Sequence, residues 1–271
     1  MPCLIPELLF GIGKKLIEDR NLKPIIKFGF SGKESLNILM NVFASVTSVG
    51  IYDNQIGIGW DQKCLYFNVE EFPKCFLYCM GENVKSLYIE REINPIFQTI
   101  IDKIISQKQL ITFSAGKDSY CSHTLKMNKF LPSFSSTLKE LKIPFRALNE
   151  EIIDSLKIET LSLVNCFNFS LSKILIQCGN INSPFHASIQ SLTFIDKTGT
   201  LYLGKEEFKF LFLIFPSLKN IKFNMKYNGR IKRDLSALLN LSKMLDFHQK
   251  LFILFYQMNL AICKNICKDF I

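Results

Sequence analysis

Four segments of the chain carry apolar residues at the i, i+3, i+4, i+7 spacing of an amphipathic helix, and strand-like runs separate them. The four helical patterns start at Leu36, Phe97, Leu171 and Ile231. Runs such as PIIKFGF at residues 24–30, NQIGIGW, KCLYFNV, KSLYIER and QLITFSA alternate apolar and polar residues, which predicts strands with one buried face. A chain with this pattern folds as helices packed on sheets, so the order of these segments constrains the architecture.

The helical patterns recur at nearly regular distances along the chain. Leu36 and Phe97 lie about 61 residues apart, and Leu171 and Leu235 lie about 64 residues apart. Leu36 and Leu171 are separated by about 135 residues. These offsets predict two similar halves, each containing two units of a strand, a helix and a run of antiparallel strands. The predicted fold class is therefore α+β, with helices covering one face of antiparallel sheets.

The charge of the chain indicates an anionic partner. The 271 residues include 33 lysines and arginines against 24 aspartates and glutamates, which gives a formal net charge of +9. Such a balance suggests nucleic acid or an anionic membrane surface as a partner. No uncharged apolar run reaches the roughly 18 to 20 residues of a membrane helix, and the N-terminus does not resemble a signal peptide. We expect a soluble, intracellular protein with no membrane association.

The nine cysteines predict neither a disulfide framework nor a metal site. They are scattered through apolar contexts, which fits reduced, buried thiols. Two CxxxC pairs occur, at Cys75/Cys79 and Cys263/Cys267, but zinc sites use closer pairs, usually with nearby histidines. We expect no metal and no cofactor.

Several stretches resemble the DNA sliding clamp family, which includes the proliferating cell nuclear antigen and the subunits of the heterotrimeric DNA-damage checkpoint clamp. The stretch IIKFGFSGKESLNILMNVFASVTSVGIYDNQIGIGWDQK is similar to that family's first strand, first pore helix and following hairpin. IPFRALNEEIIDSL resembles the opening of the second domain in the Hus-type subunit of the checkpoint clamp, and KNIKFNMKYNGRIKRDLSALL resembles the final strand and pore helix. Residues 1–23 lie outside the resemblance.

The resemblance implies a non-catalytic clamp subunit with four segments: an N-terminal extension at 1–23, clamp domain I at 24–130, an interdomain linker at 131–141 and clamp domain II at 142–271. Antiparallel sheets would form the outside, and two helices of each domain would line a central hole. With two other subunits the chain would form a trimeric ring around double-stranded DNA in the nucleus. A separate clamp loader would place the ring, which would then be a platform for repair and checkpoint signalling proteins.

A sliding ring needs positive charge that contacts phosphates without reading bases. Lysines and arginines stand opposite the apolar stripes of the four helical patterns or at the entry to the last of them. The predicted DNA-facing residues are Lys33, Lys103, Lys173, Arg230, Lys232, Arg233 and Lys243. For each residue alone, an ordinary solvated helix face is an equally good interpretation.

One short motif favours a different function. Residues 114–119, SAGKDS, resemble the SGGxDS pyrophosphate loop of ATP-pyrophosphatase-type adenylating enzymes. In this alternative the nucleotide would be bound by Ser114, Gly116, Lys117, Asp118 and Ser119. Ala115 replaces the first glycine of that loop, and the surrounding pattern predicts antiparallel hairpins, whereas such an enzyme needs parallel strands.

The direction of the sheet at Ser114 separates these hypotheses. A clamp predicts an antiparallel hairpin there, and the nucleotide enzyme predicts a parallel strand that leads into a helix. A third hypothesis is an unrelated, non-enzymatic α+β interaction module whose positive charge reflects genome composition alone.

Overall fold

The structure is a computed structural model that describes residues 5–60, 63–90, 93–116, 127–164, 183–196, 211 and 213–225. The chain divides into two compact units, Met1–Leu138 and Lys139–Ile271. The division falls within residues 131–141, the predicted linker, where the chain forms a 3-10 helix at Leu131–Phe134 (η2) and enters strand Glu140–Pro144 (β6).

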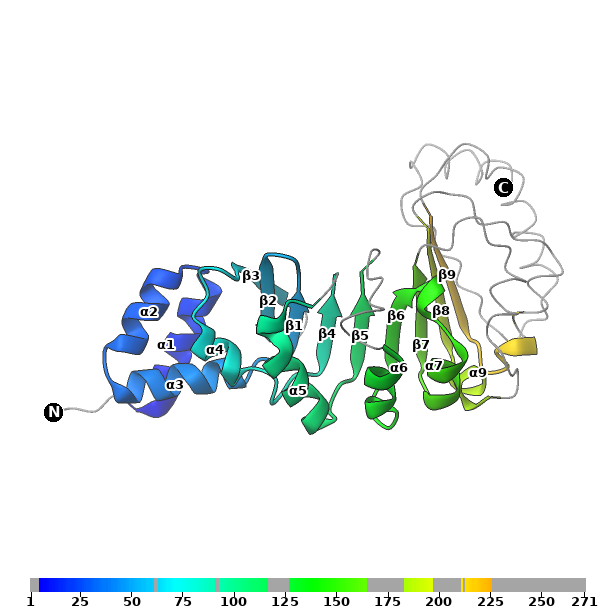
Figure 1. Cartoon of the computed structure of the whole chain (residues 1–271), viewed down its shortest axis with the longest axis horizontal. Helices are drawn as coiled ribbons and strands as arrows, with labels where there is room; N and C mark the ends of the chain where they lie inside the picture. The colour runs from blue at the N-terminus through cyan, green and yellow to red at the C-terminus, as the bar shows by residue number, and fades with distance from the viewer. Residues whose placement is uncertain are drawn as a thin grey trace, which may run out of the picture. The chain divides into compact units, whose positions relative to one another are not determined.

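The first unit opens with three helices that pack against one another, Pro6–Glu18 (α1), Leu22–Phe30 (α2) and Lys33–Ala44 (α3) (Figure 1). The side chain of Asn21 caps α2 by accepting a hydrogen bond from the backbone N–H of Lys23 at 3.2 Å. Residues 24–30 were predicted to form a strand, and that prediction is wrong. Ile25 and Gly29 are both buried and lie four residues apart, which is the spacing of one helix face. The segment follows this helical spacing and not the short apolar alternation that predicted a strand.

The helical group is fixed to the following sheet through Trp60. The ammonium group of Lys14 on α1 lies 4.9 Å from the centre of the Trp60 ring, and Trp60 Nε1 donates a hydrogen bond to Ser45 Oγ at 3.0 Å. Residues 1–23 therefore supply a helix to the first unit.

The sheet of the first unit has the strand order β3-β2-β1-β4-β5. Its elements are Ser48–Ile51 (β1), Gln55–Trp60 (β2), Lys63–Asn68 (β3), Lys74–Cys79 (α4), Ser86–Ile89 (β4), Pro95–Phe97 (η1), Gln98–Gln107 (α5), Thr112–Ala115 (β5) and Met127–Phe130 (α6). Strands β1, β2 and β3 form an antiparallel meander, with a tight turn at Tyr52–Gln55. Strand β4 is parallel to β1, and β5 is parallel to β4.

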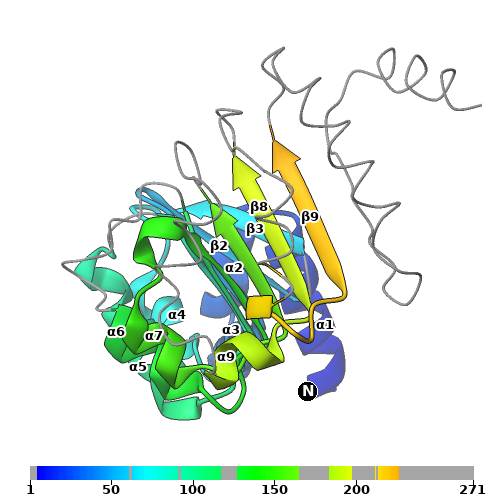
Figure 2. The same ribbon diagram turned by 90° about the vertical axis from the view of Figure 1, so that its right-hand side faces the viewer.

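The described strands of the second unit are all parallel. Its elements are β6, Phe145–Ala147 (η3), Glu150–Ser155 (α7), Thr160–Val164 (β7), Pro184–Ser188 (α9), Ser191–Asp196 (β8) and Asn220–Met225 (β9). The strand order is β6-β7-β8-β9, and Figure 2 shows β8 and β9 running in the same direction. Asn149 caps α7 through a hydrogen bond from the N–H of Ile152 at 3.0 Å.

Every parallel strand carries the same short pattern, L-x-x-L-x-L, in which L is an apolar residue. In the first unit the pattern occurs as Val46/Val49/Ile51, Val84/Leu87/Ile89 and Leu110/Phe113/Ala115, and each of these side chains is at most 2% exposed. The register places Val49 beside Leu87 and Leu87 beside Phe113. In the second unit Leu161 lies beside Leu192, and Leu192 beside Ile221. Stacked identical positions form a continuous core, which is the principle of repeat proteins.

The predicted mixture of helices and sheets is confirmed, but the predicted antiparallel pairing is wrong outside β1–β3. Alternation along a strand shows which side chains face the core, and it does not show which strand is the neighbour. Parallel neighbours need a crossover of a dozen or more residues, and the connection that contains α5 supplies one between β4 and β5.

Two of the four predicted helices are confirmed in the described residues. The pattern that starts at Leu36 lies in α3, and the pattern that starts at Phe97 runs through η1 into α5. The patterns that start at Leu171 and Ile231 lie outside the described residues.

Candidate recognition surface

The open side of the first unit's sheet carries three rows of residues across β3, β2, β1, β4 and β5. The strand register gives two rows, Cys64/Gly59/Ser48/Ser86/Thr112 and Tyr66/Gly57/Gly50/Tyr88/Ser114. Backbone hydrogen bonds just past the strands extend the ladder to a third row, Asn68/Gln55/Tyr52/Glu90/Gly116. We call these three rows the tyrosine face. They contain one charged residue, Glu90, and no lysine or arginine.

Three tyrosines form a cluster on this face, and two glycines form its floor. The ring centre of Tyr52 lies 5.4 Å from that of Tyr66, in an edge-to-face arrangement, and 5.1 Å from that of Tyr88. A Cβ at Gly50 would lie 2.9 Å from Cε2 of Tyr52, and a Cβ at Gly57 would lie 3.2 Å from Cε1 of Tyr66. The rings can lie on the sheet because neither position has a side chain.

The tyrosine face presents aromatic rings and hydroxyl groups to solvent. Tyr66 is 45% exposed, and Tyr52 and Tyr88 are half-buried. The hydroxyl of Tyr52 donates a long hydrogen bond, 3.5 Å, to the hydroxyl of Tyr66. Burial and Tyr66 raise the pKa of Tyr52, and burial, Glu90 and Tyr66 raise the pKa of Tyr88. Burial raises the pKa of the Cys64 thiol, so the face offers no activated thiolate nucleophile.

We expect the tyrosine cluster to ionise late in an alkaline titration. A raised pKa means that folding favours the neutral phenol, so this stabilisation is complete below the ordinary tyrosine pKa of about 10 and is lost at higher pH. The tyrosinate absorbance of the folded protein should therefore show a late step, and Tyr52→Phe should reduce its amplitude and leave the part that belongs to Tyr88. The exposed control Tyr78→Phe, on α4, should leave the amplitude of that step unchanged. An unchanged amplitude in Tyr52→Phe would contradict this assignment.

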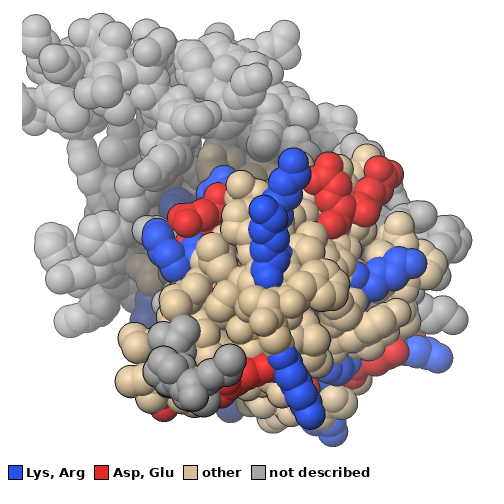
Figure 3. Space-filling model, turned by 90° about the vertical axis from the view of Figure 1, so that its left-hand side faces the viewer, with Lys and Arg blue, Asp and Glu red and all other residues tan. Residues whose placement is uncertain are grey.

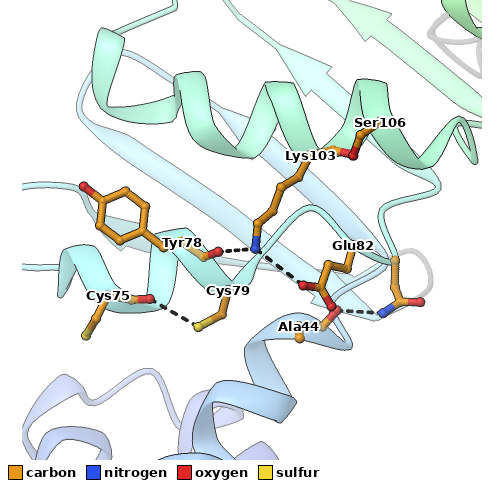
Figure 4. A network of polar contacts seen from close by, with 8 residues as sticks. Ala44, Cys75, Tyr78, Cys79, Glu82, Lys103 and Ser106 are labelled. Carbon is orange, nitrogen blue, oxygen red and sulfur yellow. Dashed lines mark hydrogen bonds and ion pairs between the residues drawn. The ribbon is translucent and has the colours of Figure 1, made fainter.

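The structure describes two of the predicted DNA-facing residues, Lys33 and Lys103, and their side chains differ in exposure and contacts. Lys33 is exposed at the start of α3. Lys103 is 31% exposed, because Nζ donates a hydrogen bond to the backbone carbonyl of Tyr78 and lies 3.5 Å from the Glu82 carboxylate (Figure 4). Lys103 therefore joins α5 to the end of α4. The other predicted residues lie outside the described ones: Lys173, Arg230, Lys232, Arg233 and Lys243.

The turn beneath Lys103 depends on Gly81. Its φ is +107°, and a Cβ there would lie 2.7 Å from Cβ of Lys103 and 3.0 Å from the carbonyl oxygen of Ile100. Asn83 fixes the next turn by donating from Nδ2 to the carbonyl oxygen of Ala44 at 3.0 Å. These contacts make the α4–α5 junction a structural feature rather than a charged surface.

The predicted pyrophosphate loop is described only in part. Ser114 lies in β5 beside Tyr88 on a parallel strand, so the predicted antiparallel hairpin at this position is wrong. A Cβ on Gly116 would clash with the carbonyl oxygen of Glu90, so close packing of two strand ends requires this glycine. Lys117, Asp118 and Ser119 lie outside the described residues. The parallel strand is the direction that the adenylating enzyme predicted, but the position of the helix that should follow it lies outside the described residues, so the adenylating activity stays a prediction.

Another contact in the second unit has the elements of a nucleophile–base pair. Ser183 Oγ lies 2.6 Å from Nδ1 of His186. The two residues are only 5% and 0% exposed, and the His186 ring packs against Phe185 and Phe215. A substrate cannot reach this pair, so it is a core contact.

Neither a metal centre nor a membrane helix is present among the described residues. In that part of the chain, no three His, Cys, Asp or Glu side chains come together as a metal site. There, too, no helix has the length and apolar character needed to cross a membrane.

The helical end of the first unit exposes apolar side chains. On and before α1, Ile5, Leu8 and Ile12 are 61%, 52% and 42% exposed, and Phe30 at the end of α2 is 84% exposed. Figure 3 shows that uncharged residues cover most of this end, with lysine, arginine, aspartate and glutamate side chains scattered among them.

The tyrosine face was not predicted from the sequence. Its three tyrosines lie 14 and 22 residues apart along the chain and belong to different strands, so no local motif joins them. The repeated L-x-x-L-x-L pattern, which indicates the residues that face away from the core, could have identified Tyr52 and Tyr88 but not Tyr66, which lies on antiparallel β3. No family model matches the chain, and no curated protein matches it.

Proposed function

We propose that the chain is a non-catalytic binding protein, in which the sheet of the first unit presents the tyrosine face as the recognition surface for a protein partner. The observation that carries this proposal is the cluster of Tyr52, Tyr66 and Tyr88 on a floor of Gly50 and Gly57. Repeat proteins use the extended surface of their stacked units for binding. This proposal corresponds to the third hypothesis from the sequence, an interaction module.

The composition of the face supports recognition of a protein. Tyrosine, serine, glycine and asparagine dominate the paratopes of antibodies, because tyrosine gives a large contact area at a small cost in side-chain entropy. Tyrosine is also enriched among the residues that contribute most to interface affinity. The Tyr66 ring packs against Tyr52 while 45% of the residue stays exposed, so it is held in place before a partner binds.

A photo-cross-linking residue tests the proposed surface. It replaces Tyr66 in one variant and Tyr78 in another, since Tyr78 is also an exposed tyrosine, 52% against 45%, but lies on α4. After irradiation in an extract of the source cells, position 66 should give a discrete protein adduct that position 78 does not give. The adduct should weaken when unlabelled wild-type chain competes. Equal labelling at both positions, or none at position 66, would contradict the proposal.

A nuclear DNA sliding clamp is our alternative proposal, and the net charge of +9 and the exposed Lys33 support it. Its partners would be double-stranded DNA, two other clamp subunits, a clamp loader, and repair and signalling proteins. We place it second because β1, β4 and β5 are parallel, as are β6 to β9, whereas the clamp prediction rests on antiparallel sheets.

Light scattering distinguishes the two proposals. A clamp predicts a particle of three subunits, alone or with partner chains, and DNA binding that Lys33→Glu weakens. A binding scaffold does not require either property. A ring of three that encloses DNA would reverse the order of the two proposals.

A further inference from the structure

We propose that the tyrosine face binds an extended, arginine-bearing segment of its partner; this inference rests on the proposed function. The face offers a positive group two kinds of contact, aromatic rings and one carboxylate. Its named residues are Tyr66 at one side, Tyr52 in the middle, and Tyr88 with Glu90 at the other side.

The charge of the tyrosine face favours a positively charged partner segment. The three rows contain Glu90 and no lysine or arginine, although the chain as a whole carries a formal charge of +9. Glu90 is close enough to Tyr88 to raise the pKa of its phenol, so the carboxylate lies beside the aromatic cluster. An acidic segment or a phosphate backbone would meet a negative charge here with no cation in the rows to offset it. A basic segment is complementary.

The arrangement of the tyrosine rings favours arginine over lysine as the basic side chain of the partner. A guanidinium group is planar, stacks on aromatic faces and donates two parallel hydrogen bonds to a carboxylate, whereas an ammonium group is a compact, strongly hydrated charge. Tyr66 meets Tyr52 edge to face at an interplanar angle of 68°, and 45% of Tyr66 remains exposed. One arginine can stack on the exposed part of Tyr66, and a second can stack on Tyr88 while it pairs with Glu90.

The tyrosine rings set the spacing of these two contacts. Tyr66 on β3 and Tyr88 on β4 lie in one row, and both rings contact the ring of Tyr52. Because the Tyr52 ring centre lies 5.4 Å from that of Tyr66 and 5.1 Å from that of Tyr88, the two outer ring centres are at most about 10.5 Å apart. An extended chain advances about 3.3 to 3.6 Å per residue, so this distance corresponds to arginines about three residues apart.

Binding of a defined peptide to the full chain tests the inference. The probe is a fluorescent glycine–serine peptide with arginine at positions three and six, and the matched peptides carry glutamate or lysine at both positions. Fluorescence anisotropy should give an affinity about tenfold higher for the arginine peptide than for the glutamate peptide. The lysine peptide should bind with intermediate affinity. Because the chain is itself positive, non-specific attraction opposes this order.

Three variants locate the binding. Tyr66→Ala and Glu90→Gln should each weaken binding of the arginine peptide by about fivefold or more. The control Tyr78→Ala removes an exposed tyrosine elsewhere in the same unit and should leave the affinity unchanged. Circular dichroism and thermal unfolding of each variant report whether the fold is intact, and Glu90→Gln, which keeps the side-chain size, serves as the second probe if Tyr66→Ala unfolds.

The outcomes separate this inference from the proposed function. Equal affinity for the arginine and glutamate peptides, or an equal loss in Tyr78→Ala and Tyr66→Ala, would overturn the arginine preference. If position 66 still cross-links to a partner while the arginine peptide does not bind, the recognition surface stands and its proposed partner chemistry is wrong. If neither occurs, both proposals fall.

Discussion

Replacing Gly81 by alanine is expected to lower the free energy of unfolding by about 3 kcal/mol. The backbone at Gly81 has φ of +107°, which residues with a Cβ rarely adopt, and the added methyl group would lie 2.7 Å from Cβ of Lys103. The added methyl group would also lie 3.0 Å from the backbone carbonyl oxygen of Ile100, so a shift away from Lys103 would not remove the crowding. Urea unfolding followed by circular dichroism measures the change.

The matched control is Gly11→Ala on α1. Gly11 lies within a helix and is exposed, and a Cβ there meets nothing within 4 Å. Alanine at this position should raise the free energy of unfolding by about 0.5 to 1 kcal/mol, because glycine is unfavourable inside helices. If the two substitutions shift the unfolding midpoint alike, Gly81 does not have the conformation and contacts described above.

Phe43→Ala is expected to destabilise the first unit by about 3 to 5 kcal/mol. The Phe43 ring on α3 is 0% exposed, stacks on Phe76 with 4.6 Å between ring centres and meets Phe72 edge-on at 5.5 Å. Removal of the ring leaves a cavity among aromatic neighbours that cannot collapse fully, so cavity and transfer costs add. Urea unfolding measures this loss of stability as a lower midpoint, with no change in the slope of the free energy against urea concentration.

Phe30→Ala controls for the chemistry of the substitution. Phe30 is 84% exposed at the end of α2, so its loss should change the free energy of unfolding by no more than about 0.5 kcal/mol. A large loss of stability in Phe30→Ala would show that this side chain is covered. A small loss in Phe43→Ala would contradict its central place in the core.

Apolar periodicity located elements well where one face of the element is buried. The spacing of Leu36, Leu39 and Phe43 identified α3, and the spacing of Phe97, Ile100 and Ile104 identified the η1–α5 segment. Periodicity failed for α2, since apolar residues in PIIKFGF fit a short strand as well as a helix. The cap at Asn21 was the overlooked signal.

The alternation of apolar and polar residues could not predict the direction of the strands. The pattern in KSLYIER and QLITFSA correctly predicted β4 and β5, yet it is the same for a parallel and an antiparallel neighbour. The sequence period that indicates parallel strands is the distance between successive strands, which is shorter than the offset of about 61 residues between the helical patterns. From β4 onward, successive strands begin about 20 to 31 residues apart, in the range of repeat proteins with one strand per repeat.

The predicted site residues show the same limit. Lys103 stands opposite the apolar stripe of its helix, which predicted a solvent-facing charge, but the end of α4 covers it and Tyr78 and Glu82 bind it. A helix pattern identifies the side that faces its own sheet and does not show what packs on the other side. Likewise, Tyr66 and Tyr88 share a row only because β1 lies between β2 and β4.

Disulfide formation between engineered cysteines tests the parallel pairing of β1 and β4, which brings Tyr52 and Tyr88 together. Parallel register places Ser48 beside Ser86, with a Cα separation of about 4.8 Å, within the range of disulfides. Ser48 and Tyr88 would be separated by about 8 Å, outside that range. Under mild oxidation, Ser48→Cys with Ser86→Cys should cross-link, as peptide mapping by mass spectrometry would show, and Ser48→Cys with Tyr88→Cys should not. The opposite result would contradict the parallel pairing of β1 and β4 and, with it, the tyrosine face.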